Sequence, residues 1–356
     1  MKKQNTDILI IGGGLTGLTL AYLLEKEALN VTIVEARHRL GGRIFTKYKA
    51  NEAPIELGAT WLGKKHRTLN GLLEKLSLEI FEQQLGTKAI FEPISTSPPQ
   101  LVSLPPNEDP SFRIKGGSSS LISALSNQLQ GTKIMLGQAI NTIEKEENVL
   151  VAKSSTHSFS TSIIISTLAP YLLINTIEIN PPLPTELIQI AQKTHTWMGE
   201  SIKVAFTYKN PFWRARKYSG TIFSNVGPVS EMYDHANYED TVFGLKGFMN
   251  GSYYSLQKEE RKILVLNQLK KYYGNQAAQY ISYEEAVWRN EPYTFQAYDS
   301  HLIPHQNNGN PIFRVPCFNG QFYIAGSETA NAFPGYMDGA IKSAEEVYEQ
   351  IKKRRS

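Results

Sequence analysis

The sequence predicts a doubly wound α/β fold in which one domain is split along the chain and a sheet-rich middle is inserted between its parts. Near the N-terminus, a short apolar run at 8–11 meets three glycines, and a helical pattern and a second apolar run follow. This order of strand, turn, helix and strand is one βαβ unit, which opens a doubly wound sheet. Near the C-terminus, another apolar run ends at a glycine before a helical pattern. We therefore expect the two ends to belong to one domain.

Periodicity predicts the remaining elements in chain order. The helical patterns cover 15–27, 67–78, 118–129, 258–273 and 339–352. The strand patterns cover 8–11, 31–34, 134–143, 148–153, 162–166, 201–208, 221–223, 241–249 and 321–325. Six prolines fall within residues 93–110, and we expect that stretch to be loop because proline cannot donate to a helix or a ladder.

Composition excludes several classes of protein. The 356 residues, 41% of them hydrophobic, are enough for one large core or two coupled domains. A formal charge of +4 is a weak imbalance on this length, so no nucleic-acid partner is expected. The single cysteine excludes an intramolecular disulfide. No stretch is apolar for long enough to span a membrane. We expect a soluble, cytoplasmic protein with no membrane contact.

The glycine turn carries a dinucleotide-binding pattern, Gly12-x-Gly14-x-x-Gly17. The first glycine permits the tight turn, the second lets backbone approach a pyrophosphate, and the third allows close packing of helix and strand. The helix N-terminus then presents partial positive charge to the phosphates. Glu35 ends the second strand, 23 residues after Gly12, where its carboxylate can accept hydrogen bonds from ribose hydroxyls. This pattern predicts a dinucleotide but does not distinguish FAD from NAD.

Further motifs resemble those of FAD-dependent amine oxidases. They are Glu35-Ala36-Arg37-His38-Arg39-Leu40-Gly41-Gly42-Arg43, Glu56-Leu57-Gly58-Ala59-Thr60-Trp61 and Tyr323-Ile324-Ala325-Gly326-Ser327-Glu328-Thr329-Ala330. With the segments at 166–170, 180–184, 202–214 and 333–340, the likeness covers nearly the whole chain and points to the flavin-dependent monoamine oxidase family. The resemblance implies a Rossmann-like FAD-binding domain in three parts, 1–75, 136–170 and 301–356. A shortened substrate-side segment at 76–135 and an α+β substrate domain at 171–300 would separate them.

The resemblance also implies the residues that hold FAD. They are Gly12, Gly14, Leu15, Thr16, Gly17, Glu35, Ala36, Arg37, Gly41, Gly42, Arg43, Gly58, Ala59, Thr60, Trp61, Ile140, Trp288, Gly326, Ser327, Glu328, Gly335, Tyr336 and Met337. No metal ligands are implied.

Three side chains are implied to be catalytic. Lys203 matches the family lysine that holds a water against flavin N5. On periodicity alone, it would be a lysine on the exposed face of a strand. Tyr298 and Tyr336 match two tyrosines that flank the substrate amine. Among 18 tyrosines, any single one is ordinarily core or surface.

The sequence departs from the family at two places. The mitochondrial enzymes attach flavin to a cysteine where this chain has Ala297, so we expect FAD to be bound non-covalently. Family members also carry a long helical segment between the regions of Leu76 and Gly116, where this chain has only the proline-rich stretch. We expect the helical subdomain that walls the substrate cavity to be largely missing.

The implied activity is oxidative deamination of a small amine by FAD, with dioxygen as acceptor and hydrogen peroxide as product. Homo-oligomerisation stays open. Two alternatives also stay open. One is an FAD-dependent desaturase or oxidase of a non-amine substrate. The other is a non-catalytic FAD-binding protein.

Overall fold

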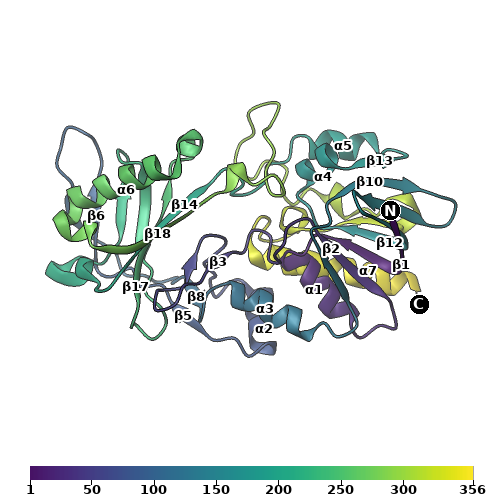
Figure 1. Ribbon diagram of the computed structural model, residues 1–356, viewed down its shortest axis with the longest axis horizontal. Helices are drawn as coiled ribbons and strands as arrows, with labels where there is room; N and C mark the ends of the chain where they lie inside the picture. Colours follow the sequence, from purple (N-terminus) through teal and green to yellow (C-terminus); the bar gives the residue numbers. More distant parts are fainter. Residues whose placement is uncertain (356) are drawn as a thin grey trace.

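An eight-stranded sheet joins segments from both ends and the middle of the chain in the computed structural model, which describes residues 1–355. Its order is β13-β10-β11-β12-β1-β2-β9, with β19 also paired to β12. The bounds are β1 Lys2–Ile11, β2 Val31–Glu35, β9 Lys133–Leu136, β10 Ile140–Lys145, β11 Leu150–Ser154, β12 His157–Ser166, β13 Glu178–Asn180 and β19 Phe322–Ile324. Figure 1 shows these purple, teal and yellow segments gathered in one half of the molecule.

Strand β12 explains how the C-terminal part returns to this sheet. Its residues 158–161 pair antiparallel with β11, whereas residues 164–166 pair parallel with β19. Along its other edge, β12 pairs in parallel with nearly all of β1. The C-terminal strand therefore lies close to the glycine turn that follows β1.

Helices cover both faces of this sheet. Ile8 and Ile10 of β1 enter one core with helices α1 (Leu15–Leu24), α2 (Arg67–Lys75), α3 (Ser119–Gln128) and α7 (Met337–Arg355). Leu9 and Ile11 enter the opposite core with α4 (Pro170–Thr176) and α5 (Thr185–Ala191). Burial on both faces is the reason that β1 ends in a continuous apolar run rather than an alternating one.

A seven-stranded sheet forms the other half of the molecule, in the order β18-β14-β17-β16-β15-β6-β7 (Figure 1). Its bounds are β6 Lys88–Glu92, β7 Gln100–Ser103, β14 Ile202–Tyr208, β15 Ile222–Ser224, β16 Val229–Asp234, β17 Phe243–Met249 and β18 Tyr280–Val287. Helix α6 (Lys258–Tyr273) packs on one face through Val265 and Leu269. That face takes Ile202, Val204 and Phe206 of β14, so the alternate residues, Lys203 among them, point to the other face.

Two small two-stranded sheets and several 3₁₀ turns complete the described chain. They pair β3 (Thr46–Lys47) with β4 (Ile55–Glu56), and β5 (Ile80–Glu82) with β8 (Phe112–Ile114). The 3₁₀ turns are η1 Phe212–Lys217, η2 Gly251–Ser255, η3 Gly274–Ala278, η4 Trp288–Asn290, η5 Pro311–Arg314, η6 Phe318–Gly320 and η7 Ser327–Thr329.

Two local predictions were wrong. Residues 93–110 are not all loop, because β7 pairs with β6 at the edge of the second sheet. The prolines lie before and after β7, and the four residues of the strand itself contain no proline. An edge strand tolerates prolines at its ends, because one side of the strand needs no hydrogen-bonding partner. The predicted strand at 134–143 is two strands, because Gly137 adopts a φ of +68° and turns the chain between β9 and β10.

Sheet membership places β9 and β13 with the first sheet. The boundary predicted at residue 135 therefore falls inside β9, and the one predicted at residue 170 falls before β13. The division into domains stays a prediction. Within residues 1–355, none of the helices combines the length and apolarity that a membrane crossing requires.

Candidate active site

A cavity of about 760 Å³ is lined by both sheets. Ile11 and Val34 come from the first sheet, and Lys203, Glu231 and Phe248 come from the second. Cofactor and ligand cavities are typically about 300–1,000 Å³. The size and position indicate a site for a large ligand that reaches from one half of the molecule to the other.

The glycine turn opens the first-sheet end of this cavity. Gly14, Leu15 and Thr16 line it, and Gly14 caps α1 without any side-chain hydrogen bond to the helix. The N-terminal amides of α1 are thus left for a ligand, and the helix dipole favours an anionic one. Gly17 lies behind the turn, where an added Cβ would be 2.0 Å from the Gly12 carbonyl oxygen. No larger residue fits there without moving the helix from the strand.

A carboxylate is fixed beside the turn. The backbone N–H groups of Gly13 and Arg37 each donate to the Glu35 carboxylate at 2.8 Å. The Arg37 guanidinium is held in turn by Glu291 at 3.1 Å and by the Thr294 hydroxyl at 2.7 Å. Glu35 is thereby oriented at the cavity wall, as a group that accepts hydrogen bonds from ribose must be.

Arg43, in the cavity wall, pairs with Glu328 from a distant segment of the chain. Arg43 donates to both Glu328 oxygens, at 2.5 and 2.8 Å, and to the Ser327 hydroxyl and the Trp197 carbonyl. The Glu328 side chain is fully buried. Burial alone would raise its pKa, but the Arg43 charge and the hydrogen bonds outweigh burial and hold the pKa below its usual value.

Segment 57–61 forms the wall where the two sheets meet. The Trp288 indole N–H donates to the Leu57 carbonyl at 2.8 Å. The Lys203 ammonium donates to the Gly58 carbonyl in a short hydrogen bond, and the Thr60 hydroxyl donates to the same carbonyl at 3.2 Å. Lys203 is 5% exposed, so it does not lie on an exposed strand face. Burial lowers the pKa of Lys203 to about 8, although the Glu56 carboxylate opposes the effect.

The two tyrosines predicted to flank a substrate have different surroundings. Tyr336 lines the cavity, and its ring lies 6.0 Å from that of Trp197 and 5.9 Å from that of His305. Tyr298 is half-buried, does not contribute to the described cavity wall and accepts a hydrogen bond from the Thr196 N–H at 2.9 Å. A chain of ring contacts connects the two tyrosines, from Tyr298 to His195, to Trp197 and to Tyr336. The paired slot stays a prediction.

The structure brings most predicted residues to this one cavity. Of them, Gly17, Gly326, Glu328 and Tyr298 lie behind or beside the described wall rather than in it. The wall also contains residues that the sequence analysis did not select, including Gln138, Thr167, Trp197, Glu231, Phe248 and Thr294. Thr167 lies in a segment already matched to the family, which was a usable signal. Glu231 and Phe248 had no such signal, because only the register of the second sheet brings them to the wall. Gln138, Trp197 and Thr294 lie in segments between the regular elements, where no periodicity reports their position.

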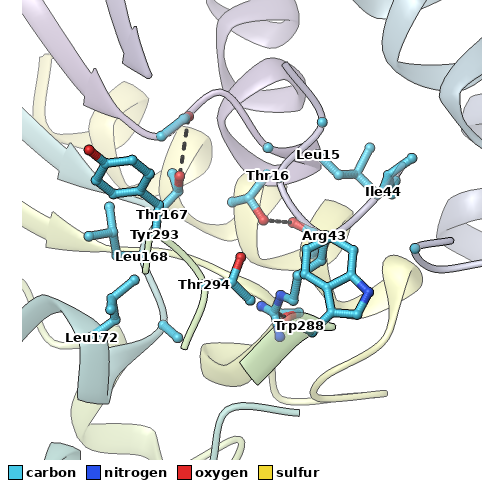
Figure 2. A pocket seen from close by; sticks show the side chains of 18 of the residues that line it. Leu15, Thr16, Arg43, Ile44, Thr167, Leu168, Leu172, Trp288, Tyr293 and Thr294 are labelled. Atoms are coloured by element: carbon cyan, nitrogen blue, oxygen red, sulfur yellow. Dashed lines mark hydrogen bonds between the residues drawn. The ribbon is translucent and has the colours of Figure 1, made fainter. Parts of the chain in front are cut away.

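Figure 2 shows how several elements meet at the wall. Leu15 and Thr16 lie at the start of α1, and the Thr16 hydroxyl donates to the Ala340 carbonyl at 3.1 Å. Thr167 donates to the Ile11 carbonyl at 2.9 Å from the end of β12. Tyr293 and Thr294 face the cavity from the segment after η4.

Comparison with known proteins agrees with this geometry. The sequence profile described as "Flavin containing amine oxidoreductase" matches residues 15–92 and 94–351.

The chain belongs to the flavin-containing amine oxidoreductase family.

The chain is 24% identical to a probable flavin-containing monoamine oxidase A of Dictyostelium discoideum over an alignment of 448 positions, which covers 97% of each chain. It is 24% identical to human amine oxidase B, over 98% of this chain and 86% of that one. Both point to the same activity class, a flavin-dependent oxidoreductase that acts on amines.

Solved structures show the same fold. A putrescine oxidase bound to putrescine superposes with a TM-score of 0.84 at 22% identity, covering 99% of this chain and all of that one. The cyclohexylamine oxidase of Brevibacterium oxydans superposes with a TM-score of 0.85 at 20% identity, with the same coverage.

The residues present fit a flavin dinucleotide. The uncapped α1 terminus and Arg43 suit the pyrophosphate, and the fixed Glu35 carboxylate suits a ribose. Gly14 and Gly42 face each other with their Cβ positions open: a Cβ added at either would meet only the α-carbon of the other, at 3.4–3.9 Å. Backbone at these points lets a planar or extended ligand approach closely.

We expect Glu328→Gln to destabilise the protein by about 3 kcal/mol at pH 7, because it leaves the Arg43 charge without its buried partner. The pKa of Glu328 is lowered by folding, so its contribution is present above the unfolded pKa and is lost as pH falls through the folded pKa. The gap between wild type and variant, measured by urea unfolding, should therefore shrink below about pH 4. Glu79→Gln, which removes an exposed pair with Lys115, is the control and should cost less than about 1 kcal/mol. Equal effects of the two variants would contradict the assignment.

Proposed function

We propose that the protein is an FAD-dependent amine oxidase that converts an amine to an imine, which water hydrolyses to an aldehyde or ketone. Dioxygen is the proposed acceptor and hydrogen peroxide the proposed second product. The observation that carries the proposal is that Lys203 and Tyr336 line the same cavity as the dinucleotide turn. The chemistry that a bound flavin supplies there is removal of two electrons and a hydrogen from the carbon next to the amine nitrogen.

The protein's own residues would orient the substrate and exclude water from the cavity. Lys203, anchored on the Gly58 carbonyl, places a positive charge at the wall where segment 57–61 meets the second sheet. Trp288 buttresses that segment through Leu57. Tyr336, Trp197 and Phe248 give an apolar, aromatic lining that displaces water and favours a neutral amine nitrogen. A fixed charge in a dry wall stabilises developing negative charge without reorganisation.

A panel of amines separates the alternatives. Peroxide released with amines alone supports the proposal. Peroxide released with non-amine substrates alone would favour the desaturase or oxidase. Bound FAD without turnover on any substrate would favour a non-catalytic FAD-binding protein. Anaerobic bleaching of the bound flavin by the same amines tests the reductive half on its own.

Lys203→Met should slow flavin reduction or reoxidation by about 100-fold, a typical effect of losing one electrostatic group in a dry site. FAD binding should change much less, because Lys203 lies away from the pyrophosphate end. Stopped-flow measurement of both half-reactions tests this. Lys209→Met, at the exposed residue that directly follows the same strand, is the matched control. Unchanged rates in both half-reactions would remove Lys203 from the mechanism.

FAD should be bound without a covalent link. Ala297 offers no nucleophile, and the one thiol, that of Cys317, is buried in the core between the first sheet and α5, away from the described cavity wall. Denaturing the yellow protein with acid or heat should release free FAD into the supernatant, where absorbance and chromatography identify it. Flavin that stays with the precipitated chain would contradict this expectation.

One wall residue favours substrates with a second positive charge. Glu231 and Glu35 are the carboxylates among the described lining residues, and Glu35 belongs to the dinucleotide end. Glu231 sits on β16 beside Phe248, which faces Lys203 across the sheet. The Tyr233 hydroxyl donates to its carboxylate at 2.5 Å. A distal ammonium can pair with this carboxylate while the other nitrogen is oxidised. The structural relative bound to putrescine, a diamine, supports the same preference.

Glu231→Gln should lower kcat/KM for 1,4-diaminobutane by about tenfold or more relative to butylamine, because only the diamine loses a charged hydrogen bond worth about 1.5–3 kcal/mol. Any effect through the Lys203 charge is common to both substrates. Steady-state peroxide assays measure both. Glu284→Gln, on the same sheet but paired with Lys49, is the control and should change neither substrate. Equal losses for the diamine and the monoamine would refute recognition by Glu231.

A further inference from the structure

A second buried lysine lies next to Lys203. In the register of β14 and β17, Lys203 faces Phe248 and Ala205 faces Lys246, so Lys246 is the diagonal neighbour of Lys203 on the same sheet face. Lys246 is 0% exposed. Two lysine amines enclosed side by side repel each other if both carry a proton, and the interior offers little water to screen them.

Both amines are anchored on one short segment. Lys203 donates to the Gly58 carbonyl, and Lys246 donates to the Thr60 hydroxyl, which itself donates to that carbonyl. The two amines also lie over the Phe248 ring, at 4.8 and 5.6 Å from its centroid. Lys246 further lies 4.2 Å from the Trp61 ring centroid. The pair and segment 58–61 therefore form one unit at the cavity wall.

The charges around the two lysines balance only if one of the two amines is neutral. Carboxylates act on the pair from two elements, Glu56 on β4 and Glu231 on β16. Arg113 on β8 already pairs with Glu56 at 3.1 Å. With both lysines charged, three cations would face two carboxylates, whereas one neutral amine balances the group.

The remaining titratable neighbours do not change this count. Burial and the Arg113 charge hold the pKa of His235 well below its usual value, so its ring is neutral. Burial and the hydrogen bond to Glu231 raise the pKa of Tyr233, so its hydroxyl keeps its proton. Burial and the neighbouring Lys203 charge hold the pKa of Lys246 well below its usual value. Of the two lysines, Lys246 is therefore the candidate for the neutral amine.

We propose that Lys246 is a positioning residue: as a neutral amine, it accepts a hydrogen bond from the Lys203 ammonium and, with the Gly58 carbonyl, holds that ammonium at the cavity wall. The role of Lys246 in catalysis rests on the proposed amine oxidase function. The protonation state of Lys203 and Lys246 does not depend on that function, and it is tested by separate measurements.

The sign of the expected effect follows from the contacts. The hydrogen bond accepted by Lys246 raises the pKa of Lys203 against the effect of burial. Lys246→Met keeps the apolar bulk and removes the acceptor, so the titration midpoint of Lys203 should fall. Loss of one hydrogen bond corresponds to about half a pH unit to one unit. Lys246→Gln supplies a neutral acceptor and should restore most of the midpoint.

The experiment uses the full chain with bound FAD and with its lysine ε-carbons labelled for NMR. The Lys203 signal is assigned by its loss in Lys203→Met, and the Lys246 signal by its loss in Lys246→Met. In wild type, Lys246 should keep the shift of a neutral amine at pH 7 while Lys203 titrates near pH 8. A Lys246 signal that is charged at pH 7, or a Lys203 midpoint that is unchanged or raised in Lys246→Met, would overturn the proposal.

Unfolding gives a second measurement should Lys246→Met bind FAD poorly. A lysine whose pKa is lowered by folding takes up a proton on unfolding, so the unfolded chain binds more protons between the folded and unfolded pKa values. Wild-type Tm should therefore rise with pH between about 7 and 9.5, and less steeply in Lys246→Met and Lys246→Gln. The same slope in all three proteins would show that Lys246 is charged when folded. Neither measurement uses turnover, so absence of peroxide would refute the proposed function alone.

Discussion

The contact between Arg43 and Glu328 is the constraint on which the cavity depends. Glu328 is fully buried in the C-terminal return, and Arg43 follows the second βαβ strand. The same two side chains hold both backbone groups of Trp197, ahead of β14: Arg43 contacts its carbonyl, and Glu328 accepts from its N–H at 3.2 Å. The Ser327 hydroxyl accepts a hydrogen bond from Arg43, and the Ser327 carbonyl accepts one from the Gly335 N–H at 2.9 Å. One ion pair thus fixes where the two sheets face each other.

Local patterns predicted the first sheet well because its information is local. A strand buried on both faces, a glycine turn and a helix appear as consecutive residues, and Glu35 follows at a fixed distance. The shape of β12 is different. Its division between β11 and β19 depends on a segment more than 150 residues away, and no periodicity within 157–166 reports it.

The second sheet shows where prediction from sequence stops. Lys203 was found through a motif, but Lys246 and Glu231 sit in strands with no motif and lie near it only because β14, β17 and β16 pair in one register. A shift by one residue would turn Lys246 to the α6 side. The alignment with the Dictyostelium relative spans 448 positions, more than the 356 residues here, so that relative carries residues that this chain lacks. We propose that the shortfall lies between α2 and α3, where β5 to β8 stand.

A neutral Lys246 also resolves a conflict between the chemistry and the charges of the cavity. An amine approaches mostly as an ammonium, and its oxidation requires it to lose that proton. Two adjacent lysine charges would repel the ammonium before it could do so, while a cavity with no cation would leave developing negative charge unsupported. Both demands are met when Lys203 is charged and Lys246 is neutral. The Glu231 carboxylate, two strands away in the same sheet, then adds a negative charge to the cavity wall. A second ammonium on the substrate would then be drawn to the Glu231 side, which places the reacting nitrogen at the Lys203 end.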